Sequence, residues 1–249
     1  VTHKTNAGGL DGTQALMVSC NYFFYVLGDT CGIKQIDATA KNLGLGEPTG
    51  VELYEAVGHR SNTDTKKMLH PESPYFNPGD QLTTAIGQSD NKFTPIQLCV
   101  YTMTLANQGV RYQATFLNRV VSADYRKLLF ENKTKVLSTM EISDEAHEVY
   151  LSGMKLVASN WEGTAYSTFG SYPIQVAAKT GTAESTAGAS ANGAFVCFAP
   201  ADDPQIAIAI YGEKVAHGSS LAPVAEKILL SYYEMTAASE FTAFENQAG

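Results

Sequence analysis

One lysine stands within an otherwise apolar stretch, in the run Lys179-Thr180-Gly181-Thr182, with alanines on both sides. The stretch favours a β-strand, and its ammonium must reach solvent or a polar partner because an unpaired buried charge is costly. The two threonines alternate along the strand, so they should point to one face, with Gly181 between them where a substrate could approach the backbone. Such a strand could bind a carboxylate. It could also be a plain edge strand that one lysine protects from pairing.

A second polar pair, Ser19 and Asn21, interrupts the helix-compatible stretch from Gln14 to Leu27. In one continuous helix these two side chains would point about 200° apart. If both serve one site, the helix must break between them, and we expect Asn21 to cap a second short helix that ends at Gly28. An S-x-N pattern carries little information by itself, and only the tertiary fold could bring it to the distant Lys179.

Apolar spacing, capping residues and breakers predict further helices. A helix from Ile33 to Leu43 should end at Gly44, and another should run from Thr94-Pro95 to Asn107. A third is expected from Ser143 to Ser159. The segment from Gly46 to Asp90 is rich in Pro, Gly, Asn and Thr, so we expect a long irregular excursion there.

Short strands are expected in the second half of the chain. Two or three should lie between Val110 and Val136, and three more are predicted at 174–184, 193–199 and 205–212. Short connectors make the last three antiparallel. A helix from Leu221 to Met235 should follow, then a frayed tail from Glu240 to Gly249. The sequence therefore predicts an α+β fold, with an antiparallel β-sheet flanked by helices.

The composition is that of an ordinary globular domain, with 249 residues, 44% apolar and 17% charged. The net charge of −8, without a cluster of Lys and Arg, argues against a nucleic-acid partner. The four cysteines have neither C-x-x-C spacing nor histidines at metal-ligand intervals. We expect buried free thiols, although disulfides stay possible.

The two polar patterns lie in segments that resemble one enzyme family. The segment A-A-K-T-G-T-A-E, from Ala177 to Glu184, resembles the third active-site motif of penicillin-binding proteins and serine β-lactamases. The segment A-L-M-V-S-C-N-Y-F-F resembles the helix and turn that carry the family's S-x-N motif. Three further stretches are similar to the class B monofunctional transpeptidases: 85–97, with Ser89 where a glycine is commoner, 162–165, and 217–225. The resemblance covers nearly the whole chain.

The resemblance implies roles for these residues, and it implies neither a metal nor a cofactor. Ser19 would relay a proton towards the leaving amine while Lys179 holds it electrostatically. Asn21 would bind the side-chain amide of the bound peptide. Thr180 and Thr182, on either side of Gly181, would hold the terminal carboxylate, and the N–H of Thr182 would supply half of an oxyanion hole.

The family's nucleophile is the serine of an S-x-x-K motif placed before S-x-N, and residues 1–18 contain no serine. Two runs match the pattern, at Ser89 to Lys92 and at Ser152 to Lys155, but both come in the wrong order and are interpreted as chance matches. We therefore expect residues 1–249 to be a single partial transpeptidase domain, incomplete at the N-terminus. Such a chain should be inactive, and its sheet should have an unpaired edge that invites self-association.

Three functions remain open from the sequence. The first is a peptidoglycan D,D-transpeptidase that binds stem peptides and β-lactams, in a membrane-anchored parent at the extracytoplasmic face of the bacterial membrane. The second is a β-lactam sensor or a non-catalytic penicillin-binding module. The third is a serine β-lactamase, which the sequence disfavours because no E-x-x-L-N-like segment follows Ser19.

Overall fold

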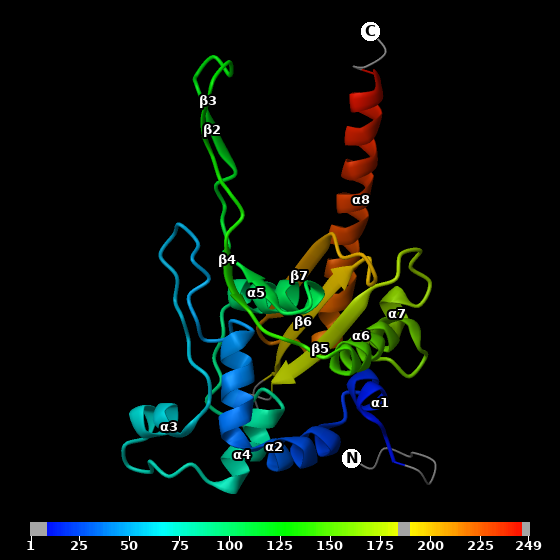
Figure 1. The fold of residues 1–249 in the computed structure, drawn as a ribbon. Helices are drawn as coiled ribbons and strands as arrows, with labels where there is room; N and C mark the ends of the chain where they lie inside the picture. The colour runs from blue at the N-terminus through cyan, green and yellow to red at the C-terminus, as the bar shows by residue number, and fades with distance from the viewer. Residues whose placement is uncertain (1–8, 184–189, 246–249) are drawn as a thin grey trace.

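A three-stranded antiparallel sheet forms the centre of the computed structural model, which describes residues 9–183 and 190–245 (Figure 1). Its strands are β5 (Ala177–Ala183), β6 (Asn192–Ala199) and β7 (Ile206–Gly212), in the order β5-β6-β7. The predicted strands and their antiparallel pairing are confirmed, and so is the α+β fold class. The predicted end of the first strand, Glu184, lies outside the described residues.

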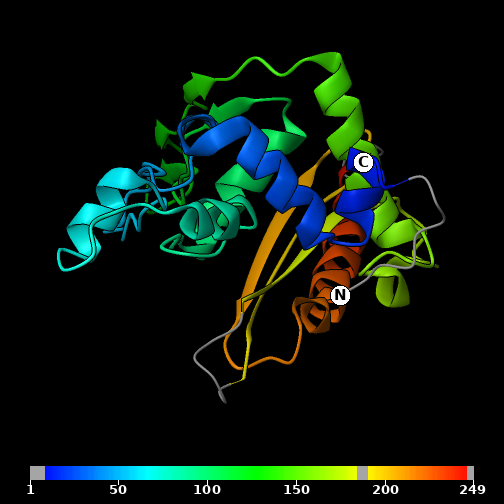
Figure 2. The same ribbon diagram turned by 90° about the horizontal axis from the view of Figure 1, so that it is seen from below.

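Each face of this sheet has its own apolar core. Ala178, Phe195 and Cys197 face one core, which α8 (Ala222–Glu245) and α7 (Tyr166–Phe169) complete. Ala177 and Phe198 face the other, against α6 (Asp144–Ser159) and α5 (Pro95–Ala106). Seen from below, α8 lies on one side of the sheet and α5 and α6 on the other (Figure 2). Neighbouring strand residues therefore point into different environments.

The first two helices break where the sequence requires a break. Helix α1 (Gly12–Met17) ends before Ser19, whose positive φ of 54° turns the chain into α2 (Asn21–Asn42). Two details of the prediction are wrong. The residue at the N-cap of α2 is Cys20 rather than Asn21, and the helix does not end at Gly28.

Helix α2 instead breaks at Gly32, whose φ of 76° and ψ of 156° are not helical. Gly28 is a packing residue, because a Cβ placed there would lie only 2.2 Å from the Cβ of Ala85. The second half of α2 ends as predicted, with Leu43 as C-cap and Gly44 at a φ of 93°.

The segment from Gly46 to Asp90 is less irregular than predicted. It contains two short helices, α3 (Thr63–Leu69) and α4 (Pro78–Ala85), which Asn62 and Asn77 cap with their side chains. Their few apolar residues gave no clear periodicity, so capping was the only signal. The asparagine-proline pair at 77–78 was the strongest such signal and was missed.

The remaining elements largely follow the prediction. Helix α5 starts after its expected cap, Thr94, and α6 starts at the expected place, where Ser143 is the N-cap. Two hairpins lie between them, formed by β1 (Val110–Tyr112) with β4 (Val136–Thr139) and by β2 (Arg119–Val121) with β3 (Leu128–Glu131). After the short 3₁₀ helix η1 (Gly218–Leu221), α8 continues to Glu245. The predicted frayed tail from Glu240 is therefore helical as far as Glu245, and its last four residues lie outside the described chain.

The contact between α2 and α4 gives a test of this packing. Gly28→Ala should lower the free energy of unfolding by about 1–3 kcal/mol, because the added methyl group overlaps Ala85. Ala85→Gly in the same chain should recover part of this loss by removing the opposing methyl group. Urea unfolding of the two single variants and the double variant measures the coupling, and strictly additive losses would contradict the proposed overlap.

Candidate active site

The structure brings Lys179 and Ser19 into direct contact. The ammonium of Lys179 donates to Oγ of Ser19 at 2.7 Å and to the backbone oxygen of Thr180 at 2.6 Å, although the first pair is separated by 160 positions in sequence. The sequence prediction that these two groups lie within hydrogen-bonding distance is confirmed by this contact. Their roles in a reaction remain predictions.

Packing of α1 places Ser19 at the lysine. Helix α1 lies against α6, where a Cβ on Gly153 would come within 2.8 Å of the Leu16 side chain. Helix α6 in turn packs against β5, so it connects the element that carries Ser19 to the strand that carries Lys179. At the end of α1 the N–H of Cys20 donates to the oxygen of Ala15 at 2.9 Å, which fixes the turn at Ser19.

Lys179 is held in an environment that disfavours its charge. Desolvation by burial lowers the pKa of this lysine from 10.5 to about 8. No carboxylate pairs with its ammonium among the described residues, so only a hydroxyl and a backbone oxygen bind it. A ligand that brings a carboxylate near this position would therefore meet a cation without a protein counter-ion.

The threonines of the same motif lie on the opposite face of β5, as strand alternation requires. Oγ1 of Thr180 is 2.8 Å from Oγ1 of Thr164, and Thr180 itself is only 8% exposed. Oγ1 of Thr182 accepts a hydrogen bond from the N–H of Gly218 at 3.0 Å, which leaves its own proton free to donate. Thr182 is exposed, so it is the more accessible of the two hydroxyls.

The outer edge of β5 is open to a ligand. Among the described strands β5 pairs only with β6. A Cβ placed on Gly181 would meet nothing nearer than Ala194, at 3.7 Å, so the surface beside the glycine is unobstructed. Asn21 is exposed at the start of α2, and no hydrogen bond engages its side chain within the described part of the chain. The hydrogen bonds of the Lys179 ammonium in the described chain go to Ser19 and Thr180, not to Asn21.

Two residues that support the motif were not predicted as site residues. Thr164 binds the hydroxyl of Thr180, and Gly218 binds that of Thr182. A Cβ on Gly218 would lie 2.0 Å from the oxygen of Gly181, so only glycine fits at this place. Both residues fall in stretches, 162–165 and 217–225, whose family resemblance was the available signal.

Neither additional S-x-x-K match has the geometry of a nucleophile and base. Ser89 lies in a turn with a φ of 62°, outside any helix. Ser152 lies in α6, but the ammonium of Lys155 pairs with Asp202. Within the described chain, no hydrogen bond joins either serine to the lysine of its pattern.

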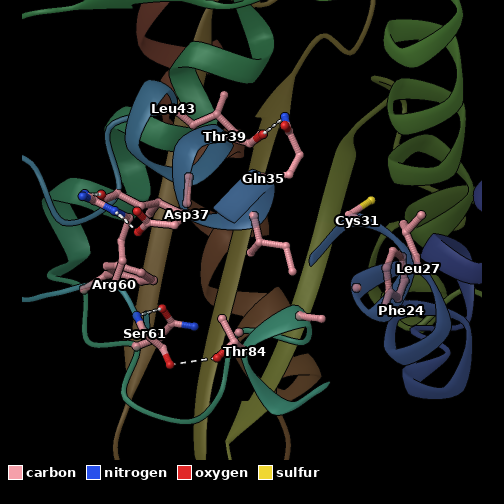
Figure 3. Close-up of a pocket in the computed structure, with 18 of the residues that line it drawn as sticks. Phe24, Leu27, Cys31, Gln35, Asp37, Thr39, Leu43, Arg60, Ser61 and Thr84 are labelled. Atoms are coloured by element: carbon pink, nitrogen blue, oxygen red, sulfur yellow. Dashed lines mark hydrogen bonds and ion pairs between the residues drawn. The ribbon is translucent and has the colours of Figure 1, made fainter. Parts of the chain in front are cut away.

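A separate cavity of about 420 Å³ lies between α2, α4 and the adjoining loops (Figure 3). Apolar side chains of α2, among them Phe24 and Leu27, line part of it. At the other side Arg60 donates to Asp37 at 2.8 Å and Thr84 donates to Ser61 at 2.8 Å. None of the motif residues lines this cavity, so it is distinct from the contact between Lys179 and Ser19.

The family model for the penicillin-binding protein transpeptidase domain matches residues 1–230. The chain belongs to this family. Its class B character follows from its relatives: it is 30% identical to the peptidoglycan D,D-transpeptidase MrdA of Acinetobacter baumannii over 249 residues, covering 94% of this chain and 36% of that protein. The MrdA protein of Escherichia coli is 28% identical, with 91% of this chain and 37% of that protein covered.

Solved structures show the same relationship. PBP2 from Helicobacter pylori matches with a TM-score of 0.74 and 27% identity, covering 90% of this chain and 39% of that one. Pseudomonas aeruginosa PBP2 matches with a TM-score of 0.77 and 27% identity, covering 90% of this chain and 47% of that one. The chain thus spans between a third and a half of the length of these relatives.

The prediction for the cysteines can also be compared with the structure. The four cysteines are free thiols, but only Cys20 and Cys197 are buried, while Cys31 is exposed. Among the described helices, none is both long and apolar enough to cross a membrane.

The depressed pKa of Lys179 predicts a specific pH dependence of stability. Because the pKa of this lysine is about 8 in the folded chain and 10.5 ordinarily, the unfolded state binds more protons between these values. The free energy of unfolding should therefore rise as the pH increases from 8 to 10.5. Relative to Lys179→Met, which has no such titration, the rise should reach up to about 3 kcal/mol.

Chemical denaturation across this pH range measures the difference between the two chains. Lys34→Met serves as the matched control, because Lys34 is exposed on α2. Curves for the original chain and Lys179→Met that stay parallel from pH 8 to 10.5 would contradict the buried-lysine interpretation.

Proposed function

We propose that this chain is part of a peptidoglycan D,D-transpeptidase, which cross-links stem peptides by acylation of an enzyme serine and transfer of the acyl group to an amine. The observation that carries the proposal is the 2.7 Å contact between Lys179 and Ser19, which joins two of the family's motifs. The names of the MrdA relatives, peptidoglycan D,D-transpeptidases, agree with it.

In this proposal Ser19 and Lys179 handle the proton of the acylation step. As the nucleophile attacks the peptide carbonyl, its proton passes by way of the Ser19 hydroxyl to the leaving amine. Lys179 donates a hydrogen bond to the Ser19 oxygen, so it orients the hydroxyl that carries the proton. A lysine pKa near 8 keeps most of this group charged at neutral pH while allowing exchange.

The edge of β5 would bind the peptide substrate. The uncompensated charge of Lys179 and the exposed hydroxyl of Thr182 are suited to the terminal carboxylate. The hydroxyl of Thr180 is already hydrogen-bonded to that of Thr164, so Thr182 would make the main threonine contact. The exposed amide of Asn21 is free to bind the peptide's own amide group. The N–H of Thr182 would polarise the carbonyl that is attacked.

The nucleophile itself is proposed to belong to an S-x-x-K segment outside these 249 residues, so that residues 1–249 form a single partial domain. This proposal rests on the geometry around Ser89 and Ser152, neither of which pairs with its lysine in the described chain. The sensor and β-lactamase alternatives are not favoured, because the relatives are D,D-transpeptidases.

The proposed location is the extracytoplasmic face of the bacterial membrane, through an anchor in a longer parent protein. The proposed ligands are stem peptides and β-lactams, with no nucleic acid. PBP2 of Helicobacter pylori was solved as a complex with MreC, and an equivalent assembly partner is proposed for the parent protein.

The first test of this function is covalent labelling. Incubated with a fluorescent penicillin, the 249-residue chain should gain no mass, because losing the nucleophile of a serine enzyme typically costs about 10⁶ in rate. A longer chain from the same gene that includes S-x-x-K should gain one penicillin, measured by intact mass. A stoichiometric adduct on the short chain, mapped to Ser89 or Ser152, would overturn the assignment of the nucleophile.

A second test concerns the outer strands of the sheet. In the described chain β5 and β7 each pair on one side only, and unpaired edges invite pairing with another chain. Light scattering should therefore show the apparent mass rising with protein concentration. A strict monomer at every concentration would contradict self-association through the sheet.

A further inference from the structure

The β2–β3 hairpin, residues 119–131, projects away from the rest of the described chain (Figure 1). In Figure 1 it stands at the end of a long two-stranded stalk, away from the central sheet. Its strands pair with each other, and within the described chain no other element packs extensively against either strand. A two-stranded hairpin alone is marginally stable in water, so an exposed one gains from covering its surface.

The stem and the turn of this hairpin are nevertheless well defined. The N–H of Phe116 donates to Glu52 at 3.0 Å, which ties the stem to the segment before α3. In the turn, the N–H of Ser122 donates to the oxygen of Lys127 at 2.8 Å, and Asp124 accepts from the Ser122 hydroxyl and the Arg126 N–H. The projecting element is therefore a hydrogen-bonded hairpin with a defined turn.

Both faces of the hairpin are apolar and exposed. Val120 is directly opposite Phe130 on one face, with exposures of 40% and 46%. Beyond a register shift, Leu128 is opposite Val121, which points to the other face, and Leu128 is 51% exposed. Leu129, the unpaired residue at the register shift, is 57% exposed, while Tyr125 in the turn is 85% exposed. A groove on a protein would cover one face and leave the other in water. An environment that surrounds the hairpin would cover the apolar side chains of both faces.

The charge of the hairpin region is opposite to that of the whole chain. Residues 115–137 contain five of the 17 Lys and Arg but only two of the 25 Asp and Glu, in a chain of net charge −8. All five cations are exposed, and none forms an ion pair within the described chain: Arg119, Arg126, Lys127, Lys133 and Lys135. The negative charges of the two carboxylates are partly offset. Asp124 accepts hydrogen bonds within the turn, and Glu131 lies opposite Arg119.

We propose that the β2–β3 hairpin is a peripheral membrane-contact element that binds the headgroup region of an anionic lipid bilayer. Aromatic rings and leucines would enter the interface between headgroups and acyl chains, while lysines and arginines remain at the level of the phosphates. Each such cation near an anionic surface strengthens binding roughly fivefold. This contact is independent of the proposed transpeptidase chemistry, since it uses none of the motif residues.

The test is sedimentation of the 249-residue chain with phospholipid vesicles. Vesicles of phosphatidylcholine with about 30% phosphatidylglycerol should bind the chain, and pure phosphatidylcholine vesicles should bind it much less. Raising the salt concentration should weaken the binding because it screens the phosphates. Absence of binding to the anionic vesicles at low salt would overturn the proposal.

Paired variants assign the binding to the hairpin. Arg126→Gln with Lys127→Gln should reduce vesicle partitioning roughly 25-fold. The matched control, Lys34→Gln with Lys227→Gln, removes the same charge from exposed positions on α2 and α8 and should leave partitioning nearly unchanged. Leu128→Ser with Phe130→Ser should weaken it at least about tenfold without changing the net charge. Equal losses in the control pair and the hairpin pair would overturn the assignment.

A spectroscopic measurement covers the case in which a charge variant fails to fold. With Trp161→Phe as background, Tyr125→Trp places the single tryptophan of the chain at the hairpin turn. Its emission should shift to the blue with anionic vesicles and stay unchanged with neutral ones. Hairpin-dependent dimerisation without lipid, together with no emission shift, would assign this surface to a second copy of the chain and overturn the membrane contact.

Discussion

The burial of one ammonium group is the constraint on which the arrangement of the site depends. Lys179 follows two alanines that are completely buried, so its charge lies at the margin of the core. Without a carboxylate partner in the described chain, the ammonium is stabilised by two oxygens, one of which is the Ser19 hydroxyl. That hydroxyl is in reach only because α1 ends early and Ser19 adopts a positive φ. The hydrogen bond of the strand lysine therefore depends on the break between α1 and α2.

Strand alternation then divides the motif between two environments. Lys179 faces the side of α1 and α6, whereas Thr180 and Thr182 face the side where Thr164 and Gly218 bind their hydroxyls. A single strand thus connects a proton-handling group with the groups proposed to bind a carboxylate. Because the two sets lie on opposite faces, a ligand can contact both only along the open edge of β5, where Gly181 leaves space.

Local signals in the sequence were sufficient for much of this fold. The Thr94-Pro95 cap placed the start of α5, apolar spacing placed α6, and short connectors fixed the antiparallel pairing of β5, β6 and β7. The break between Ser19 and Asn21 was predicted from helix geometry alone, because two side chains so placed on one helix could not serve one site. These features depend on neighbours in sequence, which explains why they could be read without the tertiary structure.

The features that could not be predicted all depend on contacts between distant segments. Gly28 has the sequence signature of a helix end, but its place against Ala85 makes it a contact between two helices, and the break falls at Gly32 instead. Thr164 carries no chemical signal until the fold sets its hydroxyl beside that of Thr180. The same holds for the β2–β3 hairpin, whose apolar residues resemble those of any half-buried strand. Only the absence of extensive packing in the described chain distinguishes them from core residues. Because nothing there covers them, their side chains form a surface that is available for binding.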